Sequence, residues 1–181
     1  ESHERARLLR AVVDEFSDRL MIGEVVLPPV RAVAYYGNDL DEAHFPHNFA
    51  LTEILKWSAA EVRAVVEAYE AVLPPGAWPN WLLGDHDFPR IASRVGPERT
   101  RLVQLLLFSL RGTPTCYYGD ELGLPTADLS RSDLAVVDPQ AAGAPWTNRL
   151  TARTPMQWSP ARHGGFSDVE PWLPLASDQP N

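Results

Sequence analysis

The strongest constraint on the fold of this 181-residue chain is an alternation of short apolar runs with helix-like segments. The apolar runs are brief and end in turn-forming or polar residues, as strands do. They are RLMIGEVV (19–26), HFPHNFAL (44–51), NWLLGDHD (80–87) and TPTCYYG (113–119). Strands separated by helices predict βαβ units, a parallel sheet and an α/β fold, either a barrel or a doubly wound sheet. In both architectures, functional side chains lie at the carboxyl ends of the strands.

Three segments between or beside these runs have helical periodicity. Residues 2–16 place four apolar side chains on one face at the spacing i, i+3, i+4 and i+7: Leu9, Val12, Val13 and Phe16. Residues 58–76 begin with a capping box of Ser58 and Glu61 and end in Pro-Pro-Gly. Residues 96–112 begin at a Gly-Pro and end at Gly112.

Composition narrows the classes of partner. The formal net charge of −8 disfavours nucleic acid and anionic membranes, since both are polyanions that need clustered Lys and Arg. The longest apolar run, LVQLLLFSL, is too short to span a membrane. Cys116 is the only cysteine, which excludes an intrachain disulfide and favours a reducing, cytoplasmic location. The chain starts without Met or a signal pattern, so we expect it to be an excerpt of a longer protein.

Ionisable side chains follow two of the predicted strands directly. Glu24 comes after the apolar Leu-Met-Ile-Gly, and Asp85, His86 and Asp87 come after Trp-Leu-Leu-Gly. In a parallel sheet these ends share one rim, and a pair of carboxylates in one cleft is what glycoside hydrolysis requires. Taken singly, Glu24 is more often a cap or ion-pair partner and His86 a structural histidine. The combination favours the catalytic interpretation.

Several stretches resemble the α-amylase superfamily, glycoside hydrolase family 13, and within it the oligo-1,6-glucosidases and α-glucosidases. MIGEVV is similar to the strand-five motif, LLGDHDFPRI to the strand-seven Asn-His-Asp motif, and RGTPTCYYGDELGL to the strand-eight segment. ARTPMQWSP, followed by GGFS and PWLPL, is similar to a stretch typical of the glucosidase branch. Together these motifs extend from about residue 19 to residue 175.

The resemblance implies a fold and a set of roles. It implies strands five to eight of a (β/α)8 (TIM) barrel over residues 1–181, with 124–181 a long irregular region after strand eight. Glu24 would be the general acid/base and Asp87 the transition-state stabiliser of a retaining α-glucosidase acting on short oligosaccharides. His86 would bind hydroxyls of the non-reducing glucose. Further sugar contacts would come from Phe88, Arg90, Glu121 and Arg153.

Two departures from the family pattern affect this interpretation. Asp85 stands where the family usually has Asn, which adds a negative charge beside the site. The family's nucleophile is an Asp on strand four, in a motif like Arg-x-Asp, and neither Asp14 nor Asp18 matches it. We therefore expect the second half of a barrel, inactive alone, whose uncovered faces favour self-association.

Other interpretations remain open. A trehalose synthase-like transglycosylase or isomerase would use the same residues, and a non-catalytic carbohydrate-binding descendant would explain Asp85. An incomplete gene would explain the missing strands. His44 and His47 have the spacing of a metal pair, but Pro46 interrupts it and no third ligand follows, so we expect neither a metal nor a cofactor.

Overall fold

The computed structural model describes residues 1–129 and 149–176. The chain divides into two compact units, the first made of Glu1–Leu82 and Ser109–Thr115, the second of Leu83–Phe108 and Cys116–Asn181. Of the irregular region predicted over 124–181, residues 130–148 and 177–181 lie outside the described residues. Among the described residues, no helix combines the length and apolarity that crossing a membrane requires.

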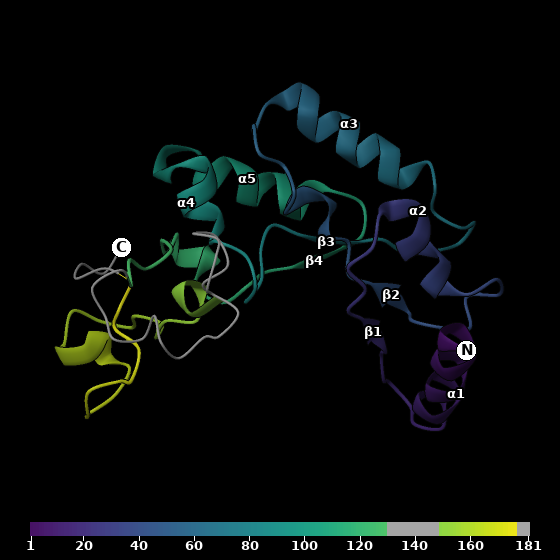
Figure 1. Ribbon diagram of the computed structural model, residues 1–181, viewed down its shortest axis with the longest axis horizontal. Coiled ribbons are helices and arrows are strands. Elements are labelled where there is room, and N and C mark those ends of the chain that lie inside the picture. The colour runs from purple at the N-terminus through teal and green to yellow at the C-terminus, as the bar shows by residue number, and fades with distance from the viewer. Residues whose placement is uncertain (130–148, 177–181) are drawn as a thin grey trace. The chain divides into compact units, whose positions relative to one another are not determined.

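The first unit contains all four predicted strands, each in its expected place but shorter. Strand β1 (Ile22–Gly23) pairs in parallel with β2 (Phe45–Pro46), and β3 (Asn80–Leu82) pairs in parallel with β4 (Thr113–Thr115) (Figure 1). The described strands therefore form two parallel pairs in place of one continuous sheet. Pro46 has no N–H group to donate, which limits how far β2 extends its ladder. A side-chain contact links the pairs, because His47 Nδ1 lies 2.8 Å from Asn80 Oδ1.

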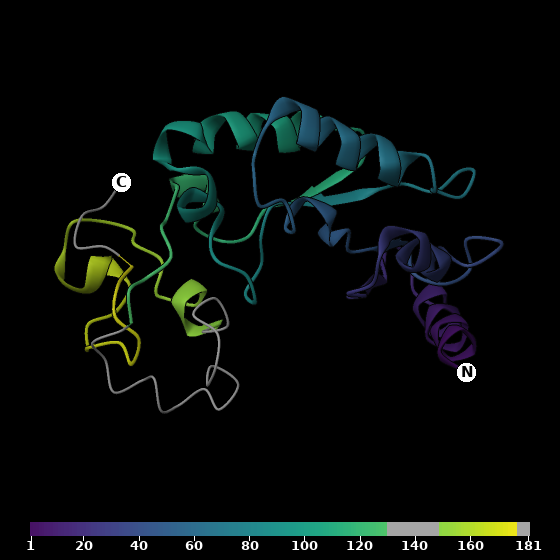
Figure 2. The same ribbon diagram turned by 45° about the horizontal axis from the view of Figure 1, so that its top comes forward.

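The helix predicted after β2 is confirmed as α3 (Ala59–Glu70), preceded by the short η2 (Phe49–Leu51). The Ser58 hydroxyl accepts a hydrogen bond from the Glu61 N–H, which is the expected N-cap. Figure 2 shows α3 lying over the β3–β4 pair. There Tyr69 packs edge-on against the fully buried Trp81, with ring centroids 5.2 Å apart, and this contact secures the helix to β3.

The first helix, α1 (Ser2–Asp14), forms as predicted, but its apolar stripe is not buried. Leu9, Val12 and Phe16 are 62%, 54% and 61% exposed. Polar side chains hold the helix instead: His3 and Arg7 both contact the buried Glu42 carboxylate, at 2.8 and 2.7 Å. A helix attached by its polar face leaves the hydrophobic one uncovered. The loop it contacts follows α2 (Pro29–Ala32) and η1 (Val33–Tyr36).

The second unit begins where β3 ends. It contains α4 (Ile91–Val95), which the sequence did not predict, and nearly all of α5 (Pro97–Ser109), which it did. Short 3-10 turns follow: η3 (Asp120–Leu122), η5 (Arg149–Ala152) and η6 (Arg162–Gly165). A small apolar cluster packs η5 onto neighbouring segments, and its members are Ala127, Leu129, Leu150 and Leu173. This packing fixes the position of η5 within its unit.

Candidate active site

Glu24 immediately follows β1, as the sequence predicted. Its side chain is exposed, and no hydrogen bond or ion pair to its carboxylate is formed by the residues that the structure describes. The backbone before it is well fixed, because the His47 N–H donates to Gly23 O at 2.7 Å. The strand therefore holds the backbone next to Glu24 in place while its carboxylate stays available to another molecule.

The two histidines considered as a metal pair have structural hydrogen bonds. His44 Nδ1 accepts from the Met21 N–H at 2.9 Å, which requires that nitrogen to be unprotonated. Burial lowers the pKa of His44, and the nearby Arg10 charge lowers it further. The ring of His47 is turned toward Asn80. Both residues thus use a ring nitrogen to support β1, β2 and β3.

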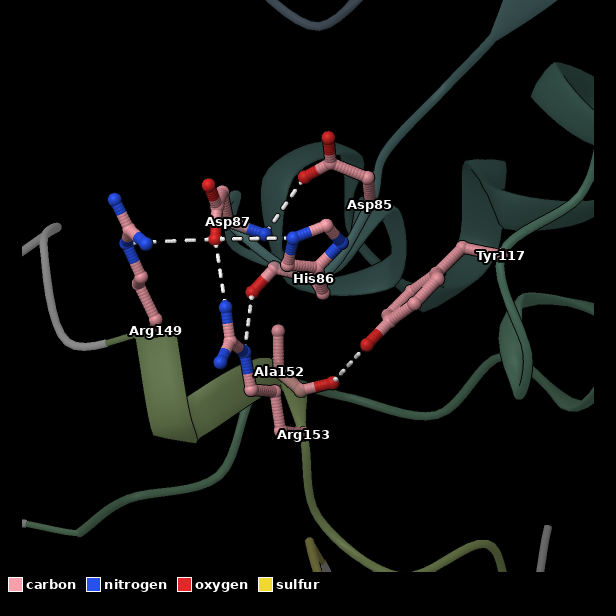
Figure 3. Close-up of polar contacts among 7 residues, drawn as sticks. All are labelled: Asp85, His86, Asp87, Tyr117, Arg149, Ala152 and Arg153. Carbon is pink, nitrogen blue, oxygen red and sulfur yellow. Dashed lines mark hydrogen bonds and ion pairs between the residues drawn. The ribbon is translucent and has the colours of Figure 1, made fainter. Parts of the chain in front are cut away.

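The turn after β3 is shaped by Asp85. Its Oδ1 accepts the backbone N–H of Asp87 at 2.7 Å, which is the hydrogen bond of an Asx turn (Figure 3). An Asn at this position would offer a carbonyl oxygen to the same N–H. The departure from the family pattern therefore preserves this hydrogen bond, while it adds a negative charge and removes an amide donor.

Asp87 is held through one of its two oxygens. Its Oδ1 lies 2.8 Å from Arg153 Nη2, 3.4 Å from Arg149 Nε and 3.5 Å from His86 Nε2 (Figure 3). Arg153 also donates through Nε to the His86 backbone carbonyl at 3.1 Å. Among the described residues, no hydrogen bond to Oδ2 of Asp87 is found, and the side chain is 29% exposed. One oxygen is thus oriented by cations and the other is open to a ligand.

The structure brings together three of the predicted site residues: His86, Asp87 and Arg153. Arg149 joins them and was missed by the sequence analysis. Its position four residues before Arg153 was the available signal, and the short turn η5 between them brings both guanidinium groups to Asp87. Glu24 belongs to the first unit and these residues to the second. The shared mouth expected for Glu24 and Asp87 therefore stays a prediction.

Arg90 does not occupy the sugar-facing position expected of it. The residue is only 1% exposed, and its Nη1 donates to Tyr118 O at 2.6 Å. Its guanidinium lies over the rings of Tyr117 and Tyr118, 5.2 and 4.7 Å from their centroids. A group enclosed in this way cannot contact a substrate, so the predicted role of Arg90 is corrected to an internal one.

The remaining predicted sugar contacts, Phe88 and Glu121, lie in two different segments of the second unit. Phe88 is half-buried in the turn after Asp87. Glu121 is exposed on η3, where it lines a cavity of about 590 Å³ together with residues of α5. No hydrogen bond or ion pair between Glu121 and Asp87 is found among the described residues. Their roles toward a sugar stay predictions.

Asp120 is a buried acid close to Arg90 and Arg94. Asp120 is 2% exposed, and burial raises its pKa to about 7 against the opposing effect of Arg90 and Arg94. The preceding Gly119 has φ +84°, and a Cβ there would lie 2.9 Å from Arg90 Nη1. Glycine at this position therefore allows the backbone to pass close to the guanidinium.

Comparison with known proteins gives the family of the chain. Residues 1–180 match the model of the alpha amylase catalytic domain. The human amino acid transporter heavy chain SLC3A1 is 34% identical over 188 residues, covering 97% of this chain and 26% of that protein. Maltase A1 of Drosophila melanogaster is 36% identical over 184 residues, covering 93% of this chain and 32% of that protein. The chain thus spans about a quarter to a third of these relatives.

A solved structure supports the same assignment. The alpha-glucosyl transfer enzyme XgtA superposes with a TM-score of 0.81 at 31% identity, over 96% of this chain and 33% of that one. This likeness, with the parallel strand pairs and their intervening helices, confirms the (β/α)8-barrel class predicted from the sequence. The chain belongs to the alpha-amylase catalytic-domain family.

Proposed function

We propose that this chain is the strand-five to strand-eight half of a retaining α-glucosidase barrel acting on short α-glucosides. The observation that carries the proposal is the environment of Asp87, whose Oδ1 is oriented by Arg149 and Arg153 while Oδ2 accepts no hydrogen bond from the described residues. A carboxylate fixed on one side by cations suits repeated binding of sugar hydroxyls in one geometry. Membership of the family and similarity to a maltase support the choice of reaction.

In the proposed reaction, Glu24 is the general acid and then the general base. It would protonate the glycosidic oxygen of the leaving sugar and later take a proton from the attacking water. Asp87 and His86 would bind the glucose ring more tightly in its distorted, oxocarbenium-like form than in its relaxed form. The exposed, unbonded carboxylate of Glu24 suits a group that exchanges protons with a ligand.

The nucleophile of this reaction would come from outside the present residues. Asp14 is the last residue of α1, and Asp18 lies in the turn after it, so neither follows a strand. A retaining mechanism needs the nucleophile about 5–5.5 Å from the acid/base. We therefore expect the chain alone to be inactive.

The test is an assay of the isolated chain with an aryl α-glucoside. We expect no turnover, whereas the chain joined to the preceding half of its barrel should hydrolyse the substrate. Turnover by the isolated chain that Glu24→Gln abolishes would contradict the missing-nucleophile proposal. Reading the gene upstream for a strand-four Asp separates a catalytic parent from a non-catalytic one.

Two specific observations favour alternatives. Similarity to an alpha-glucosyl transfer enzyme favours transfer of glucose to a second sugar, as in the transglycosylase alternative. Similarity to an amino acid transporter heavy chain, together with Asp85, favours a non-catalytic descendant. Product analysis of the complete protein with maltose and with isomaltose distinguishes them: glucose alone indicates hydrolysis, a new disaccharide or longer sugar indicates transfer, and both sugars unchanged indicates a non-catalytic protein.

Exposed apolar side chains support the proposal that the isolated chain self-associates. On α5 they include Leu102, Leu105 and Phe108, each at least 60% exposed, and α1 has a similar stripe. Monomeric proteins rarely leave such contiguous patches uncovered. Size-exclusion chromatography should show concentration-dependent oligomers that Leu105→Asp reduces, and a stable monomer would contradict this. A cytoplasmic location stays a prediction.

A further inference from the structure

Arg90 is a buried cation whose surroundings do not include a bound carboxylate. No ion pair to Arg90 is formed among the described residues, although the residue is almost completely enclosed. Its charge is met by the two tyrosine faces and the Tyr118 carbonyl. The nearby Asp120, whose pKa burial raises to about 7, is only partly ionised at neutral pH. These contacts favour a role for Arg90 in orienting Tyr117 and Tyr118.

The two tyrosines connect Arg90 to the segment that restrains Asp87. Their rings meet edge to face, with centroids 4.7 Å apart. The Tyr117 hydroxyl donates to Ala152 O at 3.0 Å, and the Tyr118 hydroxyl donates to Thr154 O at 2.7 Å. Burial raises the pKa of Tyr117, so its hydroxyl remains a donor at neutral pH.

The residue between the two accepted carbonyls is Arg153. Its backbone N–H donates to Leu150 O at 3.0 Å, and its guanidinium contacts both His86 O and Asp87 Oδ1 (Figure 3). Fixing the backbone on both sides of Arg153 limits where that guanidinium can lie. Loss of either tyrosine bond would therefore loosen the contact to Asp87.

We propose that Arg90, Tyr117 and Tyr118 form a positioning clamp, which holds residues 152–154 so that Arg153 orients the carboxylate of Asp87. None of the three clamp residues is a catalytic residue. The catalytic consequence of the clamp rests on the proposed function, whereas its existence does not, because it can be measured without turnover.

The test is hydrogen exchange in the whole chain carrying Tyr118→Phe or Arg90→Lys. The phenylalanine keeps the ring and removes only the hydroxyl, so residues 149–154 should exchange roughly tenfold faster, the ratio expected from one lost hydrogen bond. The Nε–H of Arg153, observed by NMR, should exchange faster as well. Exchange in α3 should stay within about twofold of the original chain, since α3 lies outside the clamp.

Arg111→Lys is the matched control. Arg111 also lies near an aromatic ring, Trp78, and binds a glutamate, Glu70, but it belongs to the first unit, whereas residues 149–154 belong to the second. Its loss should leave exchange in 149–154 unchanged. If Arg90→Lys unfolds the chain, Tyr118→Phe decides alone. Unchanged exchange of 149–154 in folded Tyr118→Phe, or an equal rise in every segment, would overturn the clamp.

In the complete protein, Tyr118→Phe should also lower kcat/KM several-fold in the folded fraction, a loss that its small effect on thermal unfolding does not explain. A merely structural tyrosine would instead lower stability and leave the kinetics of the folded fraction unchanged, which would count against the clamp. If the complete wild-type protein shows no turnover, the proposed function fails, and the exchange measurement still decides whether the clamp exists.

Discussion

The ends of β1 and β3 carry the two predicted catalytic carboxylates, and their surroundings differ sharply. Glu24 is exposed and unbonded within the described residues, whereas Asp87 is contacted by two arginines and a histidine and its backbone by Asp85. The difference matches the proposed roles. A proton donor must reach two positions in turn, on the leaving oxygen and on water, while an electrostatic stabiliser works best when it is fixed before the substrate arrives.

The largest expected effect is on catalysis and tests Glu24, the exposed carboxylate after β1. Glu24→Gln in the complete protein should lower kcat/KM by roughly 10²- to 10⁴-fold for aryl α-glucosides with poor leaving groups, because it removes proton transfer to the leaving oxygen and keeps the shape. Substrates with acidic phenol leaving groups should be affected less, since they need little protonation. Steady-state kinetics with a series of aryl α-glucosides measures both effects.

Glu53→Gln provides the control for this substitution, because Glu53 is another exposed glutamate of the first unit. It should leave the kinetics unchanged. An equal loss of kcat/KM with every leaving group would argue that Glu24 does not act as the acid.

The next largest effect tests Asp87, the restrained carboxylate after β3. Asp87→Asn should lower kcat by roughly 10²- to 10³-fold, as loss of a preorganised electrostatic group does. Asp85→Asn should retain activity, because its amide oxygen accepts the same Asp87 N–H. Kinetics of the two variants side by side check this, and a loss from Asp85→Asn as large as that from Asp87→Asn would show that the charge of Asp85 is itself required.

Substitutions in β1 and β3 should also differ in how much they lower the stability of the fold. Leu82 in β3 is 1% exposed and Ile22 in β1 is 49% exposed. Leu82→Ala should lower the free energy of unfolding by about 2–5 kcal/mol, whereas Ile22→Ala should cost about 1 kcal/mol or less. Urea titration followed by tryptophan fluorescence gives both values. Equal losses would indicate that β1 is buried in solution.

The smallest expected effect is the pH dependence contributed by Asp120, which follows β4. Its folded-state pKa, about 7, lies above the ordinary value of 3.8. The folded chain therefore binds more protons than the unfolded chain between about pH 4 and pH 7, and stability falls as pH rises through this window.

Asp120→Asn removes this loss. The variant should match the original chain near pH 4 and become progressively more stable than it toward pH 7, by at most a few kcal/mol. Urea titrations of both proteins from pH 4 to pH 8 measure the difference. A constant difference across that range would show that Asp120 has an ordinary pKa.

Much of the fold was predictable because its signals are local. The capping box at Ser58, the proline start of α5 and the apolar runs of the strands depend on neighbouring residues, and each formed in its expected place. The five-residue α4 was not predicted, since its sequence is too short to display a helical period.

The sequence by itself determined the family, the α/β class and the positions of Glu24 and Asp87 after two strands, because motifs and strand ends are properties of contiguous residues. Only the tertiary structure decided which arginines bind the Asp87 carboxylate and which one is buried. Arg90 follows Asp87 by three residues yet is enclosed by tyrosines, whereas Arg149 and Arg153, more than sixty residues away in sequence, bind the carboxylate. A long side chain takes its role from the groups that fold around it, and those groups come from distant segments.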